Sequence, residues 1–222
     1  MSEAEFVHLH VHSEFSMLDG ALRIGDLVGH AKSVGAKAIA LTDSGNMHGA
    51  VQLYNACKGS GVSPILGCEV SLVSGARGDK SQRDPHHLVL LAASQEGYQN
   101  LVRIVSRAWV DGMVDDLPRA DFELLEAHGK GLVALTACMG GYVPQAILEK
   151  GPEAGKAALE RLRGVFEPGH LFVELEDHGF PENRPLNEVL MELADELALP
   201  LVATNCAHFL SPDAARAQLA LK

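Results

Sequence analysis

The chain has 222 residues, of which 47% are hydrophobic and 21% are charged, a composition that supports a sizeable packed core and excludes a disordered chain. Eighteen Lys and Arg residues against 29 Asp and Glu residues give a net charge of −11, which argues against tight, autonomous binding of nucleic acid. No apolar run approaches the roughly 20 residues of a membrane span, and the first residues lack the basic start of a signal peptide.

The expected elements alternate along the whole chain between short apolar runs and amphipathic helical patterns. Strands are expected at residues 6–11, 37–41, 63–70, 87–92, 132–135, 171–175 and 201–204. Helices are expected at residues 24–34, 46–58, 97–109, 144–149, 153–166 and 182–197, and polar loops at 74–85 and 111–119. Seven apolar strands, most of them followed by a helix, indicate an α/β fold with a parallel sheet that is either open or closed as a barrel.

The four cysteines and eleven histidines are the side chains most able to bind a metal. Cys57, Cys68, Cys138 and Cys206 form no CxxC pair, so neither a zinc ribbon nor a disulfide framework is indicated. We therefore expect a reduced, cytoplasmic protein. The histidines do not form a tag-like run. Because histidine is the commonest metal ligand in proteins, their positions along the strands bear on a possible metal site.

Several expected strands carry potential metal ligands at one end, where functional side chains of parallel α/β folds gather. The first strand carries His8, His10 and His12, which strand periodicity places on one face, and two histidines so spaced can reach one ion. Other strand ends carry Asp43, Glu69, His87, Cys138, Glu174, Glu176, Cys206 and His208. For any one of them a hydrogen-bonded, partly buried side chain is the simpler interpretation. Together, imidazole, thiolate and carboxylate form a donor set for zinc or another transition metal.

Six segments of the sequence resemble one known family. FVHLHVHSEFSMLDG (6–20), LTDSGNM (41–47), PILGCEV (64–70), HLVLLA (87–92), GYQNL (97–101) and VATNCAHF (202–209) are similar, in this order, to PHP (polymerase and histidinol phosphatase) domains. The likeness is strongest to the PHP domain of bacterial DNA polymerase III alpha subunits. It implies a single domain over residues 1–222, with a distorted (β/α)7 TIM-like barrel. It also implies that the chain is part of a longer polymerase and carries no polymerase active site.

The resemblance further implies a cleft at the strand ends that holds up to three ions, usually zinc or manganese. His10 and His12 would hold the first ion together with Glu69, and these three would be the catalytic residues. Glu69 would bridge to a second ion that is also held by His87 and Cys138. Active relatives use such ions to activate a water that attacks a phosphorus ester.

Two positions depart from the family pattern, and both affect the metal site. Ser44 stands where the family usually has histidine, and Cys206 stands where it usually has aspartate. A third ion would keep only Asp19 and His208 as ligands, so we expect it to be weakly bound or absent. Cys206 could still ligate zinc as a thiolate, which is softer than the carboxylate it replaces.

The sequence leaves three functions open. The surviving ligands favour a metal-dependent phosphoesterase of the 3′-to-5′ exonuclease type that proofreads DNA. The two changed positions and the acidic charge favour an inactive structural module, which would stabilise the remaining polymerase domains and bind a partner such as the proofreading exonuclease subunit. A small-molecule phosphatase of the histidinol phosphatase type is the third. We expect about two bound ions, only weak binding of DNA by the chain itself, and no contact with membranes.

Overall fold

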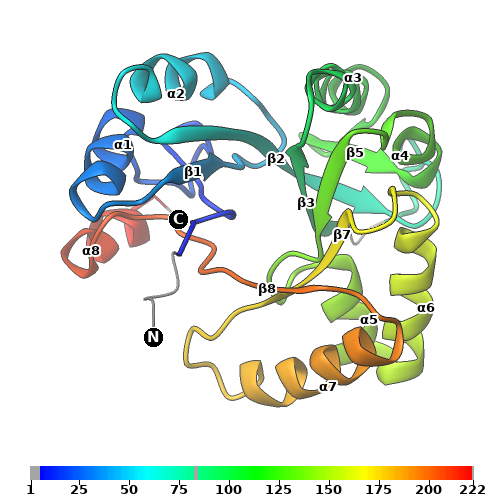
Figure 1. Ribbon diagram of the computed structural model, residues 1–222. Coiled ribbons are helices and arrows are strands. Elements are labelled where there is room, and N and C mark those ends of the chain that lie inside the picture. The colour runs from blue at the N-terminus through cyan, green and yellow to red at the C-terminus, as the bar shows by residue number, and fades with distance from the viewer. Residues whose placement is uncertain (1–5, 83–84, 222) are drawn as a thin grey trace.

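The computed structural model describes residues 6–82 and 85–221, which form eight strands with helices around their outside (Figure 1). The strands are β1 (Ala38–Leu41), β2 (Ser63–Val73), β3 (His86–Ala92), β4 (Met113–Val114), β5 (Leu117–Asp121), β6 (Leu132–Leu135), β7 (Leu171–Leu175) and β8 (Leu201–Ala203). The helices are α1 (Ile24–Ser33), α2 (Ala50–Cys57), α3 (Gln95–Asp111), α4 (Phe122–His128), α5 (Tyr142–Lys150), α6 (Pro152–Arg163), α7 (Asn183–Glu196) and α8 (Ala215–Leu219), and a 3-10 turn (Pro212–Ala214) precedes α8. The expected helices are all present, and six of the seven expected strands are confirmed.

The strands form one mixed sheet in the order β4-β5-β2-β3-β6-β7-β8, with β1 paired to β2. The pairs β1–β2, β2–β5, β6–β7 and β7–β8 are parallel, but β3 runs antiparallel to both β2 and β6. The prediction of a wholly parallel sheet is therefore wrong at β3. The physical reason is the connection between β2 and β3, whose described residues (74–82 and 85) contain no helix, so that the chain can return beside β2 in the opposite direction.

The expected strand at residues 6–11 is wrong as a regular strand, although the segment lies where that strand would be. It contacts β1 through the Ala40 N–H, which donates to the His8 carbonyl at 2.9 Å. It contacts the chain after β8 through the Val11–Ala207 bridge, where the His12 N–H donates to the Ala207 carbonyl at 2.8 Å. The α/β class is thus confirmed, but strand pairing does not close the sheet into a barrel: among the described residues, only isolated contacts through the N-terminal segment join β1 to the chain after β8.

The expected loop at residues 111–119 is also wrong, because it contains the hairpin β4–β5, and α4 follows directly. Asp115 and Asp116 have φ angles of 51° and 62°, the left-handed conformations of a tight two-residue hairpin turn. Asp121 ends β5 and caps α4, since its carboxylate accepts the Leu124 N–H at 3.0 Å. The polar turn residues make this segment resemble a loop in the sequence, although it forms a β-hairpin that leads directly into a helix.

Apolar side chains pack into three clusters, two beneath the helices and one among the strands. The largest joins β2, β3, β6 and β7 to helices α3 to α7, and a second joins α1 and α2 to β1. The third contains Ala40, Val89, Leu91, Leu135 and Ala137, from β1, β3, β6 and the loop after β6. No helix within the described residues is long and apolar enough to cross a membrane.

Candidate metal centre

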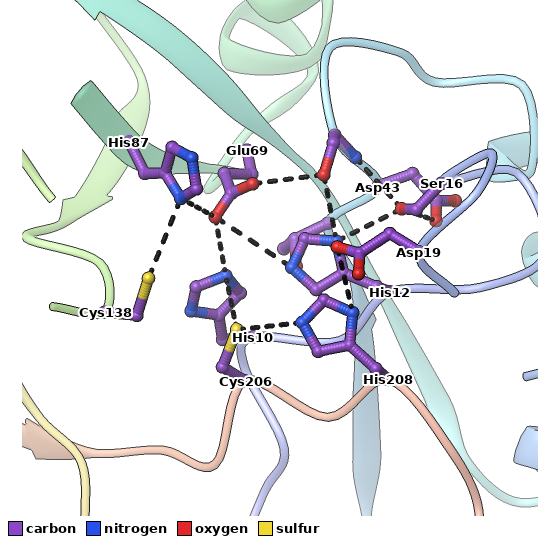
Figure 2. Close-up of polar contacts among 12 residues, drawn as sticks. His10, His12, Ser16, Asp19, Asp43, Glu69, His87, Cys138, Cys206 and His208 are labelled. Carbon is purple, nitrogen blue, oxygen red and sulfur yellow. Dashed lines mark hydrogen bonds and ion pairs between the residues drawn. The ribbon is translucent and has the colours of Figure 1, made fainter. Parts of the chain in front are cut away.

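The predicted ligands converge from five segments of the chain (Figure 2). His10 and His12 lie on the N-terminal segment, Glu69 on β2, His87 on β3, Cys138 in the loop after β6, and Cys206 and His208 in the loop after β8. The antiparallel direction of β3 matters here, because it brings the first residues of that strand beside the end of β2, where His87 pairs with Ser71. The reversal that sequence reasoning missed is therefore what brings His87 to the site.

Two clusters of three donors meet at Glu69. One contains His10, His12 and Cys206, and the other contains Glu69, His87 and Cys138, with the ligand atoms of each cluster within 4.8 Å of one another. A third group of three donors, His10 with Glu174 and Glu176, lies on the Nδ1 side of His10. Glu69 Oε2 lies 3.2 Å from His10 Nε2, 3.9 Å from His12 Nε2 and 3.0 Å from His87 Nδ1. This carboxylate therefore stands between the clusters, where it could bridge two ions.

The hydrogen bonds around His12 determine which of its nitrogens carries the proton. Its Nδ1 lies 3.1 Å from Ser16 Oγ and 3.2 Å from Ser44 Oγ. Both hydroxyls already donate to carboxylates, Ser16 to Asp43 at 2.7 Å and Ser44 to Glu69 at 3.1 Å, so each accepts from His12 Nδ1–H. His12 Nε2 is left buried, with no hydrogen-bond partner among the described residues and with a lone pair available to an ion.

His10 is held by carboxylates on its far side. Its Nδ1 lies 2.9 Å from Glu174 Oε1 and 3.5 Å from Glu176 Oε1, while its Nε2 faces Glu69 and Cys206. Thr204 Oγ1 donates to both of these glutamates, so both carboxylates are fixed in place. A carboxylate behind a histidine fixes the ring and raises its basicity toward a metal.

The residues predicted for a third ion lie at the rim. Asp19 Oδ2 is 3.3 Å from His208 Nδ1, and the His208 ring stacks on His12 with centroids 4.3 Å apart. Neither Asp19 nor His208 belongs to a three-donor cluster formed by the described residues. Ser44, at the changed family position, is used in hydrogen bonds to Glu69 and His12.

The charges of the metal-free site are set by short contacts that outweigh burial. Burial alone would lower the pKa of His10, but Glu174 and Cys206 outweigh it and raise that pKa well above its usual value. Burial alone would raise the pKa of Glu69, but hydrogen bonds with His10 and His87 hold it well below its usual value. Binding of an ion by His10 would therefore release a proton, because a ligating imidazole nitrogen must be deprotonated.

Contacts with neighbouring side chains and burial also set the pKa values of the other ligands. Hydrogen bonds with Cys138 and then Glu69 raise the pKa of His87 to about 10. The neighbouring Cys206 thiol and His87 lower the pKa of Cys138 to about 5, whereas the Cys138 thiolate and then burial raise that of Cys206. Burial lowers the pKa of His12 to about 3, so His12 stays neutral, as a metal ligand must be.

The donor set and its geometry fit a transition-metal ion. One cluster offers two imidazoles and a thiol, and the other offers a carboxylate, an imidazole and a thiol; three protein ligands is the number typical of a catalytic zinc site with an open position. The buried, unpartnered Nε2 of His12 is a second sign, because a buried polar atom without a partner costs free energy that an ion would recover. The residues present therefore fit the metal that the sequence predicts.

Three of the six non-glycine residues with positive φ in the described part of the chain lie in the loops that supply the ligands. Leu18, Ala137 and Cys206 have φ angles of 66°, 64° and 41°, in the left-handed region that non-glycine residues rarely adopt. Leu18 precedes Asp19, and Ala137 precedes Cys138. Such conformations cost about 1–3 kcal/mol each and cluster at functional sites.

Two features of the site differ from what the sequence indicates. His8 does not share a face with His10 and His12 as predicted, but lines a separate apolar cavity with Phe6 and Leu27, because the segment is not a regular strand. The sequence indicates Asp43 and Glu174 only as potential metal ligands and gives no role to Ser16 or Thr204, whereas in the structure these four side chains orient the two histidines directly or through one another. The strand-end positions of the Asp43 and Glu174 carboxylates are the signal that singles them out, and the hydroxyls of Ser16 and Thr204 have no comparable signal.

Comparisons with known proteins identify the family. A family model described as the PHP domain matches residues 8–178. The chain belongs to the PHP domain family. It is 39% identical to DNA polymerase III subunit alpha of Treponema pallidum over 98% of this chain, and 40% identical to that of Thermus aquaticus over 97%. The matches cover 19% and 18% of these relatives, so this PHP chain spans about a fifth of their length, and the predicted resemblance is confirmed.

Two solved structures share the fold of this PHP domain. An amidohydrolase from Chromobacterium violaceum, with bound sulfate and no metal, gives a TM-score of 0.58 at 17% identity and covers 98% of this chain and 97% of its own. A protein from Bifidobacterium adolescentis, named as a metal-dependent phosphoesterase, gives 0.55 at 14% identity and covers 98% and 96%. At these identities the likeness concerns the fold alone, and it supports the predicted fold class.

Proposed function

We propose that this chain is the PHP domain of a cytoplasmic DNA polymerase III alpha subunit and acts as a metal-dependent phosphoesterase of the 3′-to-5′ exonuclease type. In this proposal it binds two ions, zinc or manganese. The observation that carries the proposal is the meeting of two three-donor clusters at Glu69. The similarity to polymerase alpha subunits supports DNA as the substrate. Because the chain is acidic, the remaining polymerase domains would hold the DNA.

The chain's own residues prepare the site for this chemistry. A pair of bound ions would lower the pKa of a water and stabilise the attacking and leaving oxygens of a phosphoester. Ser16 and Ser44 keep the His12 proton on Nδ1, so that Nε2 faces the site without a proton. Glu174 holds the His10 ring so that its Nε2 faces the same space. Glu69, buried and ionised, supplies the carboxylate between the two clusters.

Nuclease assays with site variants test this proposal. The wild-type chain, supplied with Zn2+ or Mn2+, should shorten 5′-labelled single-stranded DNA from its 3′ end, and His10→Ala and Glu69→Gln should abolish this activity. His30→Ala is the matched control, because His30 is exposed on α1 and lies outside the clusters. Activity that persists in both site variants would contradict the proposal. Phosphomonoesters in the same assay test for a small-molecule phosphatase.

One observation favours a second candidate, a structural module without catalytic activity. Ser44 donates to Glu69 and accepts from His12, so it ties the two clusters together through hydrogen bonds that require no ion. Such a module would stabilise the polymerase and bind a partner such as the proofreading exonuclease subunit. No hydrolysis with any divalent ion, together with a melting temperature that falls on chelation, would support this second candidate.

A further inference from the structure

The placement of sulfur in the site points to the choice of metal. Each of the two clusters contains one cysteine, Cys206 with His10 and His12, and Cys138 with Glu69 and His87. We propose that these two thiols make the centre selective for zinc over manganese, and that Cys206 decides the selectivity of the histidine cluster. The inference rests on the proposed function and specifies the metal on which it depends.

The geometry directs both sulfur atoms into the site (Figure 2). Cys206 Sγ lies 3.6 Å from His10 Nε2 and 3.4 Å from His208 Nε2, and Cys138 Sγ lies 3.6 Å from His87 Nδ1. The other two cysteines behave differently. Cys57 is buried in the core between α1 and α2, and Cys68 donates to backbone carbonyls.

Most carboxylates near the histidine cluster are used by other groups. Glu174 and Glu176 form a separate three-donor group with His10 on its Nδ1 side, and both accept from Thr204. Asp19 pairs with His208 at the rim. Glu69 is therefore the carboxylate that stands among the inward-facing ligand atoms of His10 and His12.

This balance of donors favours zinc for two independent reasons. Thiolate is a soft ligand that suits zinc, whereas manganese prefers carboxylate, carbonyl and water oxygens. Manganese also stands at the weak end of the general affinity order of divalent ions, so replacing oxygen by sulfur or nitrogen increases its disadvantage. Aspartate in place of Cys206 would replace the thiolate with an oxygen donor, which suits manganese better. It would also preserve the local backbone conformation, because aspartate tolerates the left-handed φ observed for Cys206.

Metal competition tests the inference without relying on catalysis. The 222-residue chain is stripped with a chelator, exposed to equimolar Zn2+ and Mn2+ under reducing conditions, desalted and analysed by elemental mass spectrometry. Wild type should retain zinc with at most about a tenth as much manganese, and Cys206→Asp should raise the manganese-to-zinc ratio by about tenfold or more. Cys57→Ser is the matched control and should behave as wild type, and thermal unfolding checks that each variant is folded.

A second measurement observes the thiols directly. The Co2+-loaded wild type should show thiolate-to-cobalt charge-transfer absorption that weakens in Cys206→Asp and in Cys138→Ser but not in Cys57→Ser. Equal retention of the two ions by wild type, or cobalt binding without this absorption, would overturn the inferred zinc selectivity but would not contradict the existence of a metal site. A folded wild-type chain that retains neither zinc nor manganese would overturn the proposed function itself.

Discussion

Replacing Glu174 with glutamine should weaken zinc binding while leaving every candidate ligand in place. Glu174 is buried, its Oε1 lies 2.9 Å from His10 Nδ1, and its charge raises the pKa of His10. Glutamine keeps the shape but offers a neutral acceptor, and neutral hydrogen bonds are about half as strong as charge-assisted ones. Loss of such a carboxylate behind a ligating histidine costs about 10- to 100-fold in affinity, or about 1.4–2.7 kcal/mol.

Glu176→Gln provides the matched control for this experiment. Glu176 is also buried and also accepts from Thr204, but its Oε1 lies 3.5 Å from His10 Nδ1, too far for a good hydrogen bond. Zinc affinity is measured by competition with a chromophoric chelator, and the melting temperature of each metal-free variant confirms folding. Wild-type affinity in Glu174→Gln, or an equal loss in Glu176→Gln, would refute the hydrogen-bond argument.

Three further changes have defined outcomes. Ser44→His should raise the metal content by one ion per chain in elemental analysis, because it adds a ligand beside His12 and the Asp19–His208 pair; unchanged content would count against a third site. Burial lowers the pKa of His12 to about 3, so the neutral ring stabilises the metal-free fold above pH 6.5, and that contribution is lost as the pH falls from 6.5 toward 3. The raised pKa values of His10 and His87 act in the opposite direction, so the His12 contribution is the difference between wild type and His12→Gln in urea unfolding at pH 7.5 and 5: wild type should lose more stability, or gain less, than His12→Gln. Gly97→Ala would place Cβ 1.8 Å from the Gly131 carbonyl oxygen and should lower the free energy of unfolding by at least about 2 kcal/mol, whereas Gly29→Ala in the open middle of α1 should not lower it.

The periodic parts of the sequence predict most of the fold, and the errors fall where pairing depends on distant partners. Helices such as α1 and α3 have apolar positions at helical spacing, which is a local signal. The direction of β3 depends instead on what connects it to β2, and the lack of a helical pattern at residues 74–85 was the available sign. The segment at residues 6–11 has the alternation of a strand, but its neighbours offer it only isolated hydrogen bonds.

In the candidate site, too, the sequence predicts the ligands themselves but not the side chains that orient them through tertiary contacts. Strand-end positions and the family resemblance indicate His10, His12 and Glu69, and the structure brings these three together. The roles of Ser16 and Thr204 could not be predicted, because a hydroxyl becomes an orienting group only through the tertiary contacts that place it beside a histidine or its carboxylate partner. A serine or threonine in a loop has no sequence pattern that distinguishes this role from ordinary capping.

Backbone conformation explains why several ligands reach the site from irregular segments. Ala137 and Cys206 adopt positive φ, which costs about 1–3 kcal/mol for each residue other than glycine. Glycine at either position would remove this cost, yet the chain has side chains there, and the conformation persists only because surrounding contacts fix it. Ala137 packs in the cluster among the strands, and the Ala207 N–H donates to the His10 carbonyl at 3.0 Å immediately after Cys206. These contacts fix the backbone next to each cysteine, so that a metal ion would find the two thiols already placed and would not have to order the loops itself.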